Sequence, residues 1–160
     1  MKKIALLTLV LALVICAVSC SGGVTYKTDV KTDDIASAVQ NKLSNASVLV
    51  SADELYLSSF NSSYTSLISD WTIMYSSTGM LFDEFGIFKV ENTADTDSIV
   101  TMINEFIQLR IDGDMGYVPD ELPKIKNAKT KVCGKYVMYA FLSEGDASAA
   151  FSAFEDSLTK

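Results

Sequence analysis

The chain contains no histidine, and only three cysteines and two prolines occur among its 160 residues. Histidine is the commonest general base near neutral pH and a common transition-metal ligand, so its absence removes the usual forms of both chemistries. Cations are also scarce, with 13 Lys and Arg against 20 Asp and Glu. We expect no nucleic-acid binding, because no basic face would offset the repulsion of phosphates. We also predict no cofactor and no metal site.

The first 20 residues carry the clearest pattern in the chain. Lys2 and Lys3 precede an apolar run from Ile4 to Val18, and Ser19 stands directly before Cys20. As a helix the run spans about 22 Å, which is shorter than the bilayer core of about 30 Å. The pattern resembles a bacterial lipoprotein signal. It predicts cleavage before Cys20 and a diacylglyceryl group on the Cys20 sulfur.

Two alternatives to this lipid anchor remain. Ala17 and Ser19 also suit an ordinary secretory cleavage site, and the apolar run could stay attached as a membrane helix. With a lipid on Cys20, we expect the protein at the cell membrane on its extracytoplasmic side. The membrane would then be one partner, through the anchor, and an envelope protein or a wall component would be another. Cys133 would be the one remaining thiol, so we predict no internal disulfide.

Three segments follow from this reading: a signal peptide over residues 1–19, a flexible polar tether over 20–33, and a single domain over 34–160. Apolar periodicity predicts two short helices, then strand-strand-helix twice. In chain order these elements cover 35–44, 51–60, 71–75, 85–91, 95–113, 128–133, 136–142 and 143–158. A type II′ turn at Gly134-Lys135 joins the last two strands. The order predicts an α+β fold, a two-layer sandwich in which an antiparallel sheet of about four strands carries helices on one face.

The candidate reactive groups all have ordinary structural interpretations. Asp83 and Glu84 are adjacent at the entrance of the strand predicted over 85–91, so they point to opposite faces and cannot act together as a glycosidase pair. We interpret them as solvated charges that protect an edge strand. Cys133 has no histidine to take its proton, so we interpret it as a packing residue. We predict no catalytic residues.

Two pairs of aspartates are the candidate calcium ligands. Asp95 and Asp97 lie at the start of a predicted helix, and Asp112 and Asp114 lie at its end. Neither pair has the spacing of a calcium-binding loop. We interpret them as a helix cap and a solvated turn.

Lysines gather near the predicted hairpin. Lys129 and Lys131 share one face of a strand, and Tyr117 belongs to the proline-containing loop before it. Together these three residues are our candidate contact surface for an acidic partner. The alternative is that the lysines form the solvated face of an edge strand and prevent aggregation.

Three motifs carry a family resemblance: the segment 83–90 followed by a capped helix, the Tyr117-x-Pro119-x-Glu121 loop, and the segment 134–137. Over roughly residues 33–158 the chain resembles the domain-of-unknown-function 4358 family. Those proteins are small lipoproteins, mostly of Gram-positive, Clostridia-like bacteria, with an acceptor cysteine near the start. Gly86 departs from the pattern, where an aliphatic residue is more usual. The resemblance implies the anchor and the fold, and it implies no catalytic residues.

We therefore expect a membrane-anchored, non-catalytic binding or envelope-accessory protein. The alternative is an extracytoplasmic hydrolase that acts on wall glycan or peptide through carboxylates alone. A two-lobed solute receptor is not expected, because about 125 ordered residues are too few for it.

Overall fold

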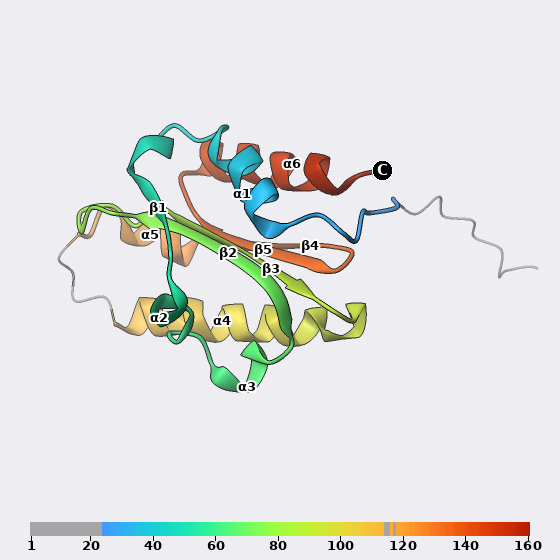
Figure 1. The fold of residues 1–160 in the computed structure, drawn as a ribbon. Helices are drawn as coiled ribbons and strands as arrows, with labels where there is room; N and C mark the ends of the chain where they lie inside the picture. Colours follow the sequence, from blue (N-terminus) through green and yellow to red (C-terminus); the bar gives the residue numbers. More distant parts are fainter. Residues whose placement is uncertain (1–23, 114–115, 117) are drawn as a thin grey trace, which may run out of the picture.

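The computed structural model describes residues 24–113, 116 and 118–160. The predicted signal peptide and Cys20 lie outside these residues. The centre of the fold is an antiparallel sheet with the strand order β1-β2-β3-β5-β4 (Figure 1). Its strands are β1 Leu49–Ser51, β2 Ile68–Ser76, β3 Glu84–Val90, β4 Lys129–Cys133 and β5 Tyr136–Phe141.

Helices cover both faces of this sheet. Helices α1 and α6 lie on one face, and α4 with α2, α3 and α5 lies on the other (Figure 1). The helices are α1 Thr32–Gln40, α2 Glu54–Leu57, α3 Ser62–Thr65, α4 Thr96–Asp112, α5 Leu122–Lys126 and α6 Glu144–Leu158. Two short 3₁₀ helices, Ala46–Val48 and Thr93–Asp95, complete the described secondary structure.

The predicted α+β class, with helices packed on an antiparallel sheet, is confirmed. The sheet has five strands rather than about four, and a second helical layer makes three layers instead of two. The reason lies in the central strand β3. Its residues Phe85 and Ile87 join the core under α1 and α6, while Phe88 and Val90 join the core under α4. A strand buried on both faces reads as a continuous apolar run, and it needs helices on each side.

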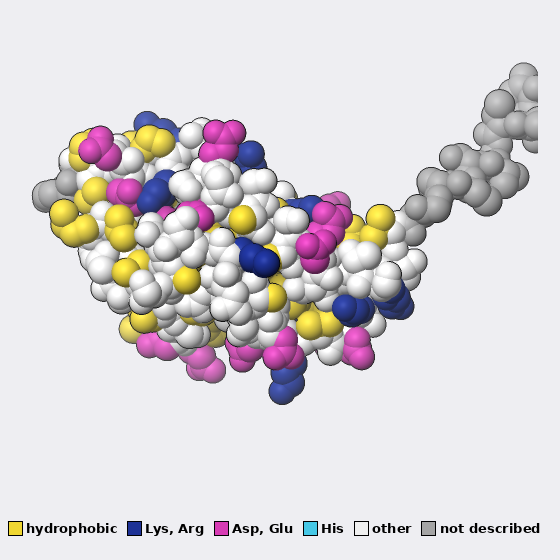
Figure 2. Space-filling view, turned by 90° about the horizontal axis from the view of Figure 1, so that it is seen from above, with side chains coloured by type: hydrophobic (Ala, Val, Ile, Leu, Met, Phe, Trp, Pro, Cys, Tyr) yellow, Lys and Arg dark blue, Asp and Glu magenta, His cyan; other side chains and the backbone are white. Residues whose placement is uncertain are grey.

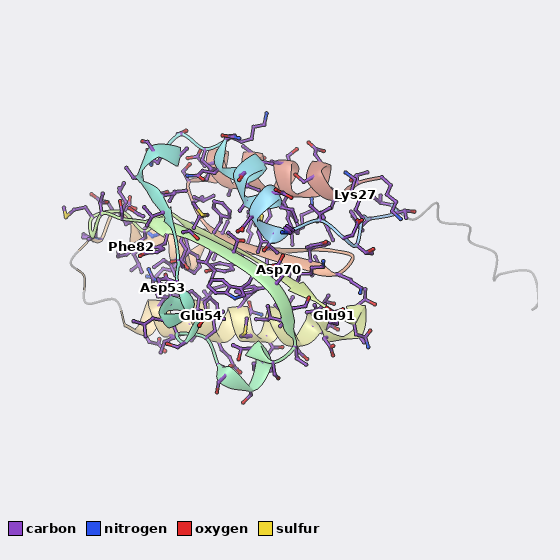
Figure 3. The ribbon with its side chains drawn as sticks, viewed as in Figure 1. Lys27, Asp53, Glu54, Asp70, Phe82 and Glu91 are labelled. Carbon is purple, nitrogen blue, oxygen red and sulfur yellow. The ribbon has the colours of Figure 1, made fainter. Side chains whose placement is uncertain are left out.

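Several helix ends are held by side chains from elsewhere in the fold. The backbone N–H of Thr32, at the start of α1, donates to Asp70 of β2 at 2.9 Å (Figure 3). Asp33, in the first turn of α1, accepts a hydrogen bond from the Thr72 hydroxyl at 2.6 Å. Ser143 caps α6, because its hydroxyl accepts a hydrogen bond from the N–H of Asp146.

The hairpin between β4 and β5 has the predicted turn. Gly134 has φ of +60°, and none of the described residues other than glycine has a positive φ. A two-residue turn with a positive φ only at its first position is of type II′. Glycine is favoured there because a Cβ atom would strain the backbone.

The two ends of the described chain meet at one side of the molecule. Tyr26 forms a β-bridge with Thr159, and the N–H of Lys27 donates to the Leu158 carbonyl at 2.7 Å. Residues 26 and 27 of the segment predicted as a tether are therefore attached to the domain. Among the described helices, none has the length and apolarity that a membrane span requires.

Candidate functional site

Glu84 is the first residue of β3 and Asp83 directly precedes it, and both are buried. Their exposed fractions are 1% and 2%. The interpretation of this pair as solvated charges on an edge strand is therefore wrong, because β3 is the central strand of the sheet. A buried carboxylate must be hydrogen-bonded or paired with a cation, so the partners of each residue decide what it can do.

Glu84 is bound by three donors from three elements. The hydroxyl of Tyr139 donates to Oε1 at 2.5 Å, and that of Tyr56 donates to Oε2 at 2.6 Å. Arg110 of α4 places Nη1 3.2 Å from Oε2. Burial raises the pKa of Glu84, although Arg110 and the two hydroxyls oppose the shift. Burial beside Glu84 likewise raises the pKa of both tyrosines.

Arg110 closes this cluster toward the solvent. Its guanidinium lies 5.7 to 6.0 Å from the ring centroids of Phe82, Phe106 and Phe141, which is cation–π distance. The side chain is 30% exposed and lines a cleft of about 210 Å³. Tyr56 and Tyr75 line the same cleft, with their rings stacked at 4.8 Å.

Asp83 belongs to a second ion pair that joins α5 to the sheet. Lys124 places Nζ 3.0 Å from Asp83 Oδ1 and 2.7 Å from Glu121 Oε2. Asn45 also donates to Asp83, at 3.2 Å. Partial burial would raise the pKa of Glu121, but the Lys124 ammonium and the N–H of Phe82 outweigh it and lower that pKa.

The two acids therefore have separate partners. Glu84 is bound by α2, α4 and β5, and Asp83 is bound by α5 and by Asn45 beyond α1. This separation follows from their adjacent positions, because successive strand residues point to opposite faces. All buried side-chain polar atoms in the described part of the chain have a hydrogen-bond partner. Neither carboxylate has the free, facing partner that a hydrolytic pair needs.

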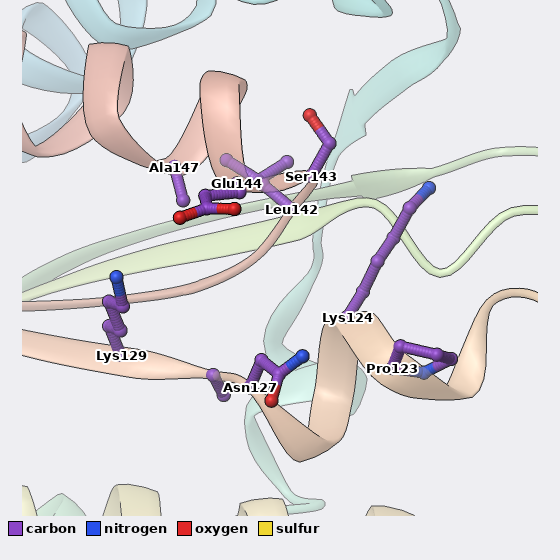
Figure 4. Close-up of a pocket in the computed structure, with 9 residues that line it drawn as sticks. Pro123, Lys124, Asn127, Lys129, Leu142, Ser143, Glu144 and Ala147 are labelled. Atoms are coloured by element: carbon purple, nitrogen blue, oxygen red, sulfur yellow. The ribbon is translucent and has the colours of Figure 1, made fainter.

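A larger cavity opens between α5 and α6, next to the first residue of β4 (Figure 4). We call it the α5–α6 groove, and its volume is about 490 Å³. Small or aliphatic side chains form its apolar part, namely Ala128, Leu142 and Ala147. Polar side chains form its rim, namely Asn127, Lys129 and Glu144.

The predicted contact residues are in different environments. Lys129 lines the α5–α6 groove, whereas Lys131 forms an ion pair with Glu155 of α6. Tyr117 and Cys20 lie outside the described residues. On the face that carries α1 and α6, acidic and basic side chains are interspersed and form no continuous basic stripe (Figure 2).

The other candidates have structural positions. Cys133 is fully buried in the core beneath α1 and α6, where burial raises the pKa of its thiol. Within residues 24–113 and 118–160, no three metal-ligating side chains lie close enough to hold an ion. This range contains Asp95, Asp97 and Asp112, whereas Asp114 lies outside it.

Sequence reasoning missed the clusters around Asp83 and Glu84, although one signal was visible. Arg110 falls in the apolar stripe of its helix, with Ile99, Ile103 and Phe106. A charge on the buried face of a helix requires a buried partner of opposite sign. Asp83 and Glu84, directly before an apolar strand, were candidates for that partner.

These observations define an α+β domain whose antiparallel sheet has two ion pairs at the start of its central strand. Residues 64–142 match the family described as Domain of unknown function (DUF4358), so the chain contains a domain of this family. The match runs from α3 to the end of β5, so it includes Asp83, Glu84 and their cationic partners but not Tyr56 or α6. No curated protein and no solved structure matched the chain.

Proposed function

We propose that this protein is a membrane-anchored, extracytoplasmic lipoprotein that binds an envelope protein or a wall component without catalysing a reaction. One contrast supports this function. The buried acids Asp83 and Glu84 are bound by the protein's own donors, while the α5–α6 groove is open to solvent. A site of that volume with an apolar part and a few polar groups is typical of binding pockets.

The position of the groove also supports this proposal. Tyr26 is bridged to Thr159 beside the C-terminal end of α6, and the groove adjoins Glu144 at the N-terminal end. The 15 residues of α6 separate the two ends by about 22 Å. With the lipid on Cys20, the groove would face away from the membrane. The net charge of −7 would not favour anionic lipid, so the acyl chains would provide the attachment.

The anchor is tested by fatty-acid labelling of cells that express the wild type or Cys20→Ser. We expect label on the wild type and none on the variant. Equal label on both proteins would remove the anchor and the membrane location together. Label on neither protein, with the mature chain in the medium, would support plain secretion instead.

Binding is tested by a photo-crosslinking residue introduced in intact cells at position 123, because Pro123 is exposed and lines the groove. Position 126 provides the control, because Lys126 is exposed on α5 and does not line the groove. We expect one defined adduct from position 123 that is absent from position 126. The same adducts from both positions, or none from 123, would contradict binding at the groove.

The alternative, a hydrolase that uses carboxylates, has one supporting observation. Burial raises the pKa of Glu84, as in many general acids, and Glu84 lines a cleft. The full chain should then release products from wall glycan or peptide, and Glu84→Gln should abolish the release. Turnover that depends on Glu84 would overturn the non-catalytic proposal.

A further inference from the structure

We propose that the α5–α6 groove binds a short peptide with both termini free, holding its carboxylate at Lys129 and its ammonium at Glu144. This inference rests on the proposed function and specifies the chemistry of the ligand. It depends on two charged groove residues that have no ion-pair partner among the described residues.

Lys129 and Glu144 approach the groove from different elements. Lys129 is the first residue of β4, and Glu144 is the first residue of α6. In Figure 4 the ammonium of Lys129 and the carboxylate of Glu144 are both directed into the space between the two elements. Neither residue forms an ion pair with the described residues. The groove therefore offers one cation and one anion at separate positions.

The other charged groups nearby are already occupied. Lys124 also lines the groove, but its ammonium is bound by Asp83 and Glu121. Asp146, in the first turn of α6, accepts hydrogen bonds from the N–H and the hydroxyl of Ser44 at 3.0 and 2.9 Å. A ligand with only one charge would satisfy only one of the two remaining groups. A ligand with two opposite charges satisfies both.

The remaining lining suits a short peptide rather than a larger molecule. The volume of about 490 Å³ lies within the range of small-ligand sites, about 300–1,000 Å³. The apolar part consists of Ala128, Leu142 and Ala147, which leaves room for small side chains. The exposed amide of Asn127 supplies both a donor and an acceptor for a peptide group.

The test uses the full chain and three probes that differ only at their termini. Alanyl-alanine has both charges, N-acetyl-alanyl-alanine lacks the ammonium, and alanyl-alanine amide lacks the carboxylate. We expect alanyl-alanine to bind in calorimetric titration and each blocked peptide to bind about fivefold more weakly, the effect of one partly exposed charge pair.

Two substitutions assign each charge to its residue. Lys129→Gln should remove the preference for a free carboxylate, and Glu144→Gln should remove the preference for a free ammonium. Lys126→Gln is the matched control, because Lys126 is exposed on the same helix as Lys124 but does not line the groove. All three side chains are exposed, so we expect unchanged melting temperatures.

Three results would overturn the inference: equal affinity for the three peptides, no binding of any of them, or a preference that survives both substitutions. Each of these would leave the proposed function in place if Cys20 is still acylated and position 123 still crosslinks. Loss of the Cys20 label or of the crosslink, with peptide binding intact, would instead contradict the proposed function alone.

Discussion

At the scale of single residues, Glu84 shows how the fold accommodates an acid in its interior. The side chain is 2% exposed, yet both carboxylate oxygens accept hydrogen bonds, and Arg110 supplies the opposite charge. Buried ion pairs recover only part of the cost of removing two charges from water. Burial therefore still raises the pKa of Glu84.

This shift predicts a pH dependence of stability. A carboxyl group with a higher pKa in the folded chain binds protons more tightly when folded, so its contribution to the free energy of unfolding falls as pH rises above about 4. Glu84→Gln removes this contribution. We expect the free energy of unfolding of the wild type, relative to Glu84→Gln, to fall between pH 4 and pH 8 in urea titrations. A difference that stays constant or rises with pH would contradict a pKa of Glu84 that burial has raised. Glu54→Gln is the exposed control.

Gly86 leaves space for Tyr139, one of the two tyrosines that bind Glu84. A Cβ atom at this position would lie 2.2 Å from Cε1 of Tyr139, whose hydroxyl binds Glu84. This contact explains why glycine replaces the aliphatic residue expected there. Gly86→Ala should displace the Tyr139 ring and lower the free energy of unfolding by about 1–3 kcal/mol. Chemical denaturation measures the loss.

The control for this substitution is Gly145→Ala in the first turn of α6. Apart from its chain neighbours and the backbone of its own helix, no atom lies within 4 Å of a Cβ atom built at Gly145. Alanine is the better helix former, so we expect no loss and a gain of up to about 1 kcal/mol. If both variants lose the same stability, the Tyr139 contact is not the cause.

At the scale of elements, the long periodic segments could be predicted from the sequence. The helix expected over 95–113 is α4, the hairpin strands are β4 and β5, and the final helix is α6. Their apolar residues recur over several helical turns or alternate along a strand, so single residues that depart from the pattern do not hide it.

The shorter elements had no such pattern. Strand β1 has three residues and helix α5 has five, too few to repeat any period. The candidate site depends on them, because Lys124 comes from α5 and Asn45 precedes β1. The groove also needs α5 and α6 side by side, a tertiary arrangement that local periodicity does not encode. Of the two predicted contact residues that the structure describes, Lys129 lines the groove and Lys131 does not.

The ion pair of Lys124 predicts how firmly α5 is held to the sheet. Lys124→Met removes the cation from Asp83, which is 1% exposed and would keep only the bond from Asn45. Breaking a buried pair from one side costs about 3 kcal/mol, because an uncompensated charge remains. We expect this loss in thermal and urea unfolding. Adding Asp83→Asn to Lys124→Met should restore part of it.

The matched control is Lys131→Met, which breaks the pair with Glu155, whose side chains are far more exposed than those of Lys124 and Asp83. Exposed pairs contribute little, so this variant should remain close to the wild type. Equal losses for Lys124→Met and Lys131→Met would show that the Asp83 pair does not hold α5. If adding Asp83→Asn does not restore stability, then the packing of the Lys124 side chain, and not its charge, stabilises the contact between α5 and the sheet.

At the scale of the whole molecule, two cores share one sheet. The core between the sheet and α1 with α6 includes Cys133, and the core on the other face includes Phe106 and Tyr139. The bridge between Tyr26 and Thr159 covers the edge of the first core near Gly134. A Cβ atom added at Gly134 would lie 3.1 Å from the Cβ atom of Tyr26. This arrangement makes Cys133 a reporter of how that core opens.

Cys133 should therefore react only when the fold opens. Its side chain is fully buried, and burial raises the pKa of the thiol, so little reactive thiolate is accessible in the folded state. We expect alkylation of the peptide that contains Cys133, followed by mass spectrometry, to be slow and to accelerate with urea in parallel with global unfolding.

Tyr26→Ala should accelerate alkylation in the absence of urea more than its loss of global stability accounts for, because it uncovers one edge of the first core locally. If alkylation of the wild type is fast in native buffer and independent of urea, Cys133 is not enclosed between the sheet and the two helices. If Tyr26→Ala changes the rate only in proportion to global stability, the first core opens as a unit with the rest of the molecule.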